Sequence, residues 1–269
     1  MTLIIRRREL LTAAALASTA AVLPSPLHSY GFYGTARFMR APSLEDDEFV
    51  WQWVVLLIDA SSSMRQLFEQ MTFYDLQIEA TARALMEPCV VDRLIGTRKG
   101  RTAIGAILWS GNAQQEIAVH WSVIRSKGDI AAVAAKLRKT ANYLDDGTGV
   151  AAAVRFAIEQ LKAVYISGTS RRIIDLTANG RDNHGGDPAA AARQAEELGI
   201  TINAVVMKGY DSTVDQIHDY YLHNVITKDG IIFKVEAENT ALEALATANA
   251  SKFCAEIAFA RRRRPRVRA

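Results

Sequence analysis

An unbroken apolar run at residues 54–58 (VVLLI) is the clearest feature of the hydrophobic pattern. An apolar run without alternation is typical of a strand that is buried on both faces, so we predict a central strand over residues 51–59. Leu76, Ala80 and Ala84 then recur at helical spacing. The pattern therefore predicts a buried strand followed by a helix that packs on it.

The alternation of strand and helix continues to the end of the chain. Further strands are expected over residues 102–110, 114–121, 172–177, 201–207 and 231–235, and helices around 130–137, 150–161, 189–198 and 242–257. Gly111 and Asn112 form a dipeptide typical of a tight hairpin turn. This order predicts a single doubly wound, Rossmann-like α/β domain with a mostly parallel central sheet, one antiparallel edge hairpin and helices on both faces. Ligands of such sheets bind outside the carboxyl ends of the strands.

The N-terminus has the composition of an export signal. The motif Arg7-Arg8-Glu9-Leu10-Leu11 resembles a twin-arginine signal, and an uncharged, alanine-rich stretch follows it. Residues 1–28 are therefore expected to be a signal peptide that directs the protein to the periplasm or the exterior. An uncleaved membrane anchor and an ordinary amphipathic helix are the alternatives. Residues 29–48 are expected to be a linker, and residues 49–258 the folded domain.

The formal net charge of +3 comes from the two ends of the chain. Leaving out Arg6, Arg7, Arg8 and Glu9 lowers it to +1, and leaving out six arginines of the tail as well lowers it to −5. Those six are Arg261, Arg262, Arg263, Arg264, Arg266 and Arg268. A mildly acidic body does not favour nucleic-acid binding. Residues 259–269 are expected to be a disordered tail, which is either simply solvated or in peripheral contact with an anionic membrane.

Two cysteines, Cys89 and Cys254, lie far apart in the sequence. In an oxidising compartment they could form one disulfide, and otherwise they would be two small core residues. The sequence leaves both alternatives open because geometry decides between them.

The loop after the first predicted strand carries a candidate metal motif. Asp59, Ser61 and Ser63 form the pattern D-x-S-x-S, in which alternate residues can turn one carboxylate and two hydroxyl groups toward a common point. Such a set of oxygens suits a small hard cation such as Mg²⁺. The alternative is a polar cluster that closes the turn and caps the next helix.

Two later segments add to this motif. Thr148 lies in the glycine-rich loop 145–149 (DDGTG), and Asn179 precedes Gly180 at the end of a predicted strand. In this combination the chain resembles the von Willebrand factor A superfamily over roughly residues 49–257. The metal-ion-dependent adhesion site of that superfamily combines D-x-S-x-S, a distant Thr and an Asp in a strand-ending T-D-G. Within the superfamily the chain is most similar to a family of exported bacterial proteins of unknown function, through IDLTANGRDNHG (174–185), LGITIN (198–203) and YYLHNVI (220–226).

The resemblance implies a site for Mg²⁺ or Mn²⁺ at Asp59, Ser61, Ser63, Thr148 and Asn179. Asn179 stands where the family pattern has Asp. An amide supplies an oxygen but no charge, so weaker metal binding is expected.

Several nearby acidic residues bear on this missing charge. Whether Asp145, Asp146 or Asp182 restores it is left open by the sequence. Asp175 is expected to be a buried residue at the start of a strand, with a structural hydrogen bond.

The resemblance also implies binding rather than turnover, with the metal accepting a carboxylate from a protein partner. Two alternatives remain: a metal-free scaffold of the same fold, which Asn179 favours, and a metal-dependent hydrolase. The hydrolase lacks parts, because no His or Glu near the D-x-S-x-S could act as a general base. His184 is expected to be a solvent-facing loop residue. We therefore expect a protein that is not an enzyme.

Overall fold

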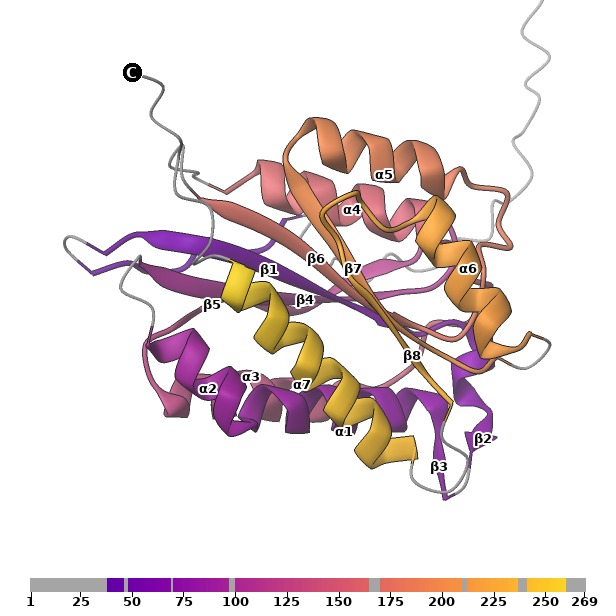
Figure 1. Ribbon diagram of the computed structural model, residues 1–269, viewed down its shortest axis with the longest axis horizontal. Helices are drawn as coiled ribbons and strands as arrows, with labels where there is room; N and C mark the ends of the chain where they lie inside the picture. Colours follow the sequence, from indigo (N-terminus) through magenta and orange to yellow (C-terminus); the bar gives the residue numbers. More distant parts are fainter. Residues whose placement is uncertain are drawn as a thin grey trace, which may run out of the picture. The chain divides into compact units, whose positions relative to one another are not determined.

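Figure 1 shows the computed structural model, whose described residues belong to one compact unit. They are residues 38–45, 48–68, 70–96, 100–164, 170–209, 212–236 and 241–259. The predicted signal peptide (1–28) and residues 260–269 of the predicted tail lie outside the described residues. Within the described part, no helix is long and apolar enough to cross a membrane.

A six-stranded sheet in the order β5-β4-β1-β6-β7-β8 forms the centre of the domain. The strands are β1 (Val50–Asp59), β4 (Arg101–Trp109), β5 (Gln115–Ile124), β6 (Arg171–Ala178), β7 (Ile200–Met207) and β8 (Ile232–Val235). Neighbouring strands are parallel except β4 and β5, which form an antiparallel pair at the edge. The predicted doubly wound α/β fold is confirmed. β4 and β5 lie on one side of β1 in the sheet, whereas β6, β7 and β8 lie on the other side, so the strand order reverses at β1.

Helices cover both faces of this sheet (Figure 1). One face carries α1 (Phe73–Met86), α2 (Pro88–Ile95), α3 (Lys127–Arg138) and α7 (Ala241–Phe259), and the other carries α4 (Val150–Lys162), α5 (Pro188–Glu197) and α6 (Val214–Asn224). The apolar run of β1 serves both cores. Val54, Leu56 and Ile58 pack under the first set of helices, while Val55 and Leu57 pack under the second. This two-sided burial explains why the run shows no alternation.

Three short elements were not expected from the sequence. They are the eight-residue helix α2, a 3-10 helix η1 (Ser62–Arg65), and a two-stranded ribbon of β2 (Leu67–Phe68) and β3 (Met71–Thr72). The helix η1 begins within the D-x-S-x-S motif, and the ribbon follows it. They lead the chain from the end of β1 into α1.

Cys89 and Cys254 form a disulfide between α2 and α7, with their Cα atoms 6.3 Å apart. Of the two alternatives left open by the sequence, the structure therefore has the bridge. It ties the C-terminal helix to a helix 165 residues earlier in the chain.

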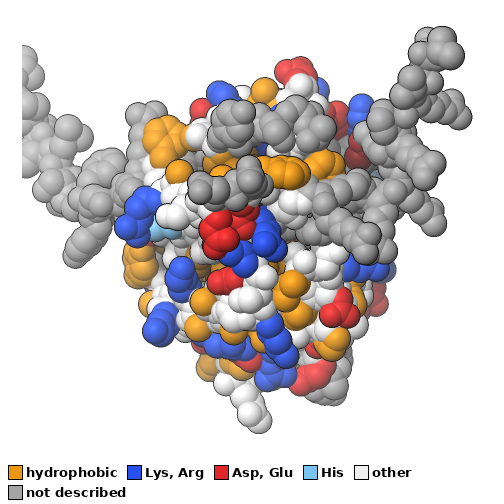
Figure 2. Space-filling view, turned by 90° about the vertical axis from the view of Figure 1, so that its left-hand side faces the viewer, with side chains coloured by type: hydrophobic (Ala, Val, Ile, Leu, Met, Phe, Trp, Pro, Cys, Tyr) orange, Lys and Arg blue, Asp and Glu red, His pale blue; other side chains and the backbone are white. Residues whose placement is uncertain are grey.

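Part of the segment expected to be a linker packs on the domain. The backbone N–H of Met39 donates to Oε1 of Gln160 at 2.8 Å, and the Met39 side chain is buried. The buried carboxylate of Glu48 pairs with Arg101 at 2.8 Å and with Arg125 at 2.6 Å. Figure 2 views the end of the sheet at which β1 begins, where basic and acidic side chains are interspersed over the described surface.

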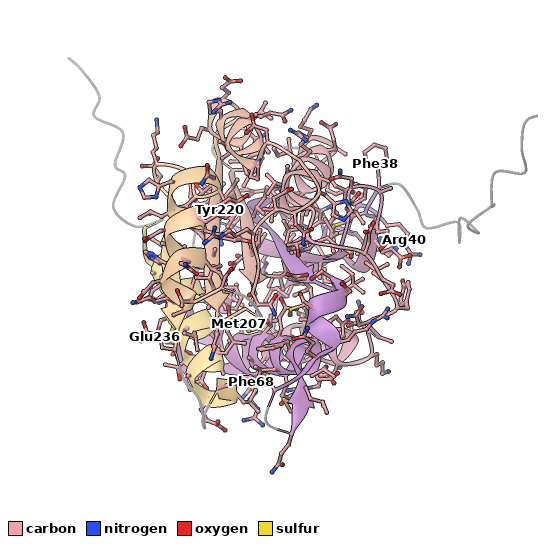
Figure 3. The ribbon with its side chains drawn as sticks, turned by 90° about the vertical axis from the view of Figure 1, so that its right-hand side faces the viewer. Phe38, Arg40, Phe68, Met207, Tyr220 and Glu236 are labelled. Atoms are coloured by element: carbon pink, nitrogen blue, oxygen red, sulfur yellow. A yellow bond between two sulfur atoms is a disulfide. The ribbon has the colours of Figure 1, made fainter. Side chains whose placement is uncertain are left out.

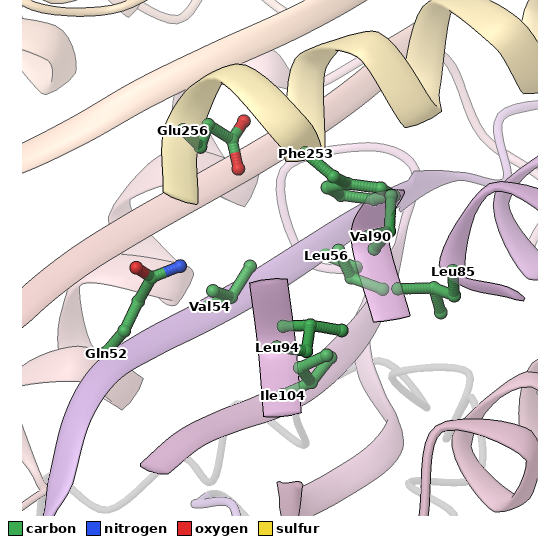
Figure 4. Close-up of a pocket in the computed structure, with 9 residues that line it drawn as sticks. All are labelled: Gln52, Val54, Leu56, Leu85, Val90, Leu94, Ile104, Phe253 and Glu256. Atoms are coloured by element: carbon green, nitrogen blue, oxygen red, sulfur yellow. The ribbon is translucent and has the colours of Figure 1, made fainter. Parts of the chain in front are cut away.

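A small cavity of about 10 Å³ lies between β1, β4, α1, α2 and α7 (Figure 4). Gln52 and Glu256 supply its polar lining, and the other lining residues are apolar. A space of this size holds at most one water molecule, so it is not a ligand site.

Candidate metal-binding site

Asp59 is the last residue of β1, and its backbone is fixed by a buried glutamine. The backbone N–H of Asp59 donates to Oε1 of Gln77 at 3.2 Å, and Nε2 of Gln77 donates to the Asp59 carbonyl at 2.9 Å. Gln77 lies on α1 and is completely buried. Sequence reasoning missed it, although a glutamine inside an apolar helix stripe signals a buried polar contact.

The carboxylate of Asp59 is buried and only partly satisfied. Its Oδ1 accepts a hydrogen bond from the backbone N–H of Ser61 at 2.9 Å. Its Oδ2 has no hydrogen-bond partner among the described residues. Burial raises the pKa of Asp59 to about 6, and the hydrogen bonds from Ser61 offset only part of this effect. A cation placed at Oδ2 would satisfy the orphaned oxygen and favour the ionised form.

Two serines and Asn179 continue the cluster. Oγ of Ser61 and Oγ of Ser63 are 3.2 Å apart, and the hydroxyl of Ser63 donates to Oδ1 of Asn179 at 3.4 Å. Asn179 directly follows β6 and is buried, and its Nδ2 has no partner among the described residues. The structure therefore brings the loop after β1 and the loop after β6 together.

Thr148 completes the predicted set. Its loop is held against the loop after β1, because the backbone N–H of Ser62 donates to the carbonyl of Asp146 at 2.9 Å. The Thr148 side chain is buried, and a Cβ added at Gly180 would lie 3.4 Å from Thr148 Oγ1. The threonine hydroxyl is thus next to the residue that follows Asn179.

Two of the carboxylates that could restore the missing charge have other partners. Asp145 is exposed and pairs with Arg65 at 3.3 Å. Asp146 Oδ1 lies 2.9 Å from Nε2 of His184 and also accepts the backbone N–H of Gly147 at 2.8 Å. The side chain of His184 is about one quarter exposed and contacts Asp146, so this histidine is more buried than the solvent-facing position expected for it.

The third carboxylate, Asp182, has a structural role. Its Oδ2 accepts the backbone N–H of Ala151 at 2.9 Å, in the first turn of α4. Its Oδ1 accepts the backbone N–H groups of His184 and Gly186, each at 3.1 Å. Asp182 therefore caps a helix and closes its own loop, and Asp59 is left as the single carboxylate among the five predicted ligands.

The donor set fits a small hard cation. It offers one carboxylate, three hydroxyl groups and one amide oxygen, the oxygen ligands that Mg²⁺ and Mn²⁺ accept together with water. Among the described residues, no group of three or more His, Cys, Asp or Glu side chains could hold a metal ion. A cation at this site would therefore depend on the neutral oxygens around Asp59.

Asp175 is not part of this cluster. It lies inside β6, is buried, and forms an ion pair with Lys252 of α7, which is also buried. Glu256, one turn further along α7, accepts a hydrogen bond from Nδ2 of Asn203 at 2.7 Å. Burial and the adjacent charge of Asp175 hold the pKa of Glu256 well above its usual range. The interpretation of Asp175 as a buried structural residue agrees with these contacts, whereas its expected place at the start of a strand is wrong, because four residues of β6 precede it.

Comparison with known proteins places this chain in a family. The family described as "Protein of unknown function (DUF1194)" matches residues 50–260. The chain belongs to this family. Comparison with curated proteins finds no significant match.

Solved structures show the same fold at low sequence identity. Proximal thread matrix protein 1 from the mussel byssus is 14% identical, with a TM-score of 0.54 over 78% of this chain and 47% of that chain. The pilus adhesin SpaC from Lactobacillus rhamnosus GG is 13% identical, with a TM-score of 0.52 over 79% of this chain and 31% of that chain. The SpRpn10 VWA domain is 12% identical, with a TM-score of 0.52 over 73% of this chain and 94% of that chain. The chain spans about half the length of the mussel protein. The domain has the von Willebrand factor A-like fold that the sequence motifs predict.

Proposed function

We propose that this chain is an exported, non-enzymatic protein-binding module whose divalent cation, Mg²⁺ or Mn²⁺, is held by Asp59, Ser61, Ser63, Thr148 and Asn179. When bound, the cation supplies a positively charged position that accepts a carboxylate from a protein partner. One observation carries the proposal: a buried carboxylate oxygen of Asp59, without a partner among the described residues, lies in a loop whose hydroxyl groups contact each other and Asn179. The mussel byssus protein, whose fold is similar to this domain, has been solved with zinc in its metal-ion-dependent adhesion site (MIDAS) motif.

Hydrogen bonds within the chain preorganise Asp59 in the metal-free site. Gln77 holds the backbone of Asp59 through two hydrogen bonds, and the Ser61 N–H orients its carboxylate. Such preorganisation lowers the entropy that binding must remove.

The export part of the proposal rests on residues 1–28 as a signal peptide, residues 29–48 as a linker and residues 49–258 as the mature domain. The Cys89–Cys254 disulfide supports it, because such bonds persist in oxidising compartments. We propose that residues 259–269 form a tail that contacts anionic membrane surfaces through its arginines.

A metal-free scaffold of the same fold is the second candidate, and a specific observation favours it. Asn179 contributes no charge, and Asp145, Asp146 and Asp182 all have other partners. Asp59 then supplies the single negative charge among the five proposed ligands.

Calorimetric titration of Mg²⁺ and Mn²⁺ into the purified domain tests the proposal. Saturable uptake is expected in the wild type and should be lost in Asp59→Ala. Asp145→Asn is the matched control, because it removes an exposed carboxylate that pairs with Arg65, and it should bind as the wild type does. Uptake that appears only in Asn179→Asp would establish the scaffold instead.

A further inference from the structure

Two exposed cations flank the proposed metal site and bear on the chemistry of its partner. Arg181 follows Asn179 by two residues, and its guanidinium carbon lies 6.0 Å from the centre of the Tyr220 ring on α6. Lys208 directly follows β7 and is exposed. Within the described part of the chain, neither side chain has a carboxylate at ion-pair distance, while the carboxylates of the neighbouring loops are engaged elsewhere.

The backbone brings both cations close to Asn179. β6 and β7 are parallel neighbours, with Ala178 opposite Val206, so Lys208 lies across from the residue that follows Asn179. The contact persists past the strand ends, because a Cβ added at Gly209 would lie 2.3 Å from the carbonyl oxygen of Asn179.

The two cations lie on opposite sides of this strand end. Arg181 is directed toward Tyr220 on α6, whereas Lys208 lines a shallow cavity of about 20 Å³ with Phe68 and Met207. Figure 3 views this end of the domain, and Met207 lies between Tyr220 and Phe68 in that view.

The charges around the proposed metal indicate which kind of partner the site would bind. A divalent cation with the single carboxylate of Asp59 leaves one net positive charge, since Asn179 adds none. Arg181 and Lys208 add two further positive charges beside it. A partner that offers one carboxylate neutralises only the metal, and neither flanking cation then has an ion-pair partner among the described residues.

Resting on the proposed metal site, we propose that the partner is an acidic peptide segment with at least two carboxylates. One carboxylate occupies the metal, and another lies within reach of Arg181 or Lys208. Arg181 and Lys208 thus offer two anion-binding positions beside the metal, which select clustered Asp or Glu residues over an isolated one.

The test uses two capped glycine-rich peptides of equal length, one with a single Asp and one with two Asp residues separated by a glycine. Fluorescence polarisation measures their binding to the Mn²⁺-loaded domain at low salt. The two-Asp peptide should bind about fivefold more tightly, which corresponds to about 1 kcal/mol. Raising the salt concentration should shrink this preference, because exposed charges are screened.

Variants separate the two subsites. The double variant Arg181→Gln and Lys208→Gln should abolish the preference and leave metal uptake and one-Asp binding unchanged. Lys127→Gln with Lys162→Gln is the control of equal net charge. These two cations lie at the start of α3 and the end of α4, away from the metal site, and the preference should survive their loss.

Two results would overturn the inference: equal binding of both peptides by the wild type, or a preference that persists in the Arg181→Gln and Lys208→Gln variant. Failure of the proposed function looks different. In that case the one-Asp peptide would bind equally well with Mn²⁺ and with a chelator.

Discussion

Replacing Asp59 with Asn should stabilise the metal-free domain, although it removes the central ligand of the proposed site. The Asp59 carboxylate is completely buried, and its Oδ2 has no hydrogen-bond partner in the described part of the structure. Asparagine has nearly the same shape and keeps an oxygen that can accept the Ser61 N–H. The substitution therefore removes a buried, unpaired charge and little else.

The magnitude follows from the pKa of this carboxyl group. Burial raises the pKa from 3.8 to about 6, a shift of roughly two units at about 1.4 kcal/mol each, or about 3 kcal/mol. A raised carboxyl pKa favours the folded state while the group is protonated. That stabilisation is complete below pH 3.8, falls as the pH rises toward 6, and is lost above it. At pH 7.5, metal-free Asp59→Asn should thus exceed the wild type by up to about 3 kcal/mol.

Urea unfolding followed by circular dichroism, with a chelator present and at pH values from 4.5 to 7.5, measures this difference. Wild-type stability should decline across the range relative to Asp59→Asn, and Asp145→Asn should follow the wild type. Saturating Mg²⁺ should reverse the order, because binding to the folded wild type adds stability that the variant cannot gain. A variant that is less stable than the metal-free wild type at pH 7.5 would refute the reasoning.

Three other changes test the fold around the site. Removing the disulfide with Cys89→Ser and Cys254→Ser should lower the unfolding free energy by about 3 to 5 kcal/mol, since the chain-entropy relation for a closed loop of 165 residues gives about 5 kcal/mol. Urea melts measure this difference, and a loss under about 1 kcal/mol would contradict it. Lys252→Met leaves Asp175 buried without its counter-charge and should lower the free energy of unfolding by about 3 to 5 kcal/mol. Adding Asp175→Asn to the same chain should restore most of this stability, and thermal melts of both variants measure the effect. Gln77→Leu leaves the backbone N–H and carbonyl of Asp59 without their side-chain partner, so it should lower the free energy of unfolding by about 2 kcal/mol and weaken Mg²⁺ uptake. Unchanged uptake in calorimetry would exclude a positioning role for Gln77.

The long elements of the fold could be predicted because their apolar patterns are unambiguous. The run in β1 is buried on both faces, and α4 repeats Val150, Val154 and Ile158 on one side. Helix α2 could not be predicted in this way, because eight residues span little more than two turns and give periodicity too few repeats to show. The two-residue strands β2 and β3 are shorter still, and they exist through pairing with each other.

Only part of the site could likewise be predicted from the spacing of its residues. Asp59, Ser61 and Ser63 share one loop, so their spacing alone predicts that they can meet. Thr148 and Asn179 join them only because the sheet order places their loops beside β1, and the sequence supplied those residues through family resemblance. The partners of Asp145, Asp146 and Asp182 depend on side-chain directions within irregular loops, and no spacing rule predicts them.

The most direct test of the central claim is a crystal of the domain grown with Mn²⁺, examined by anomalous scattering. A peak is expected at metal–oxygen coordination distance from an Asp59 carboxylate oxygen and from the Ser61 and Ser63 hydroxyls, and it should be absent from Asp59→Asn crystals. A fully occupied Mn²⁺ elsewhere, with no density at Asp59, would contradict it.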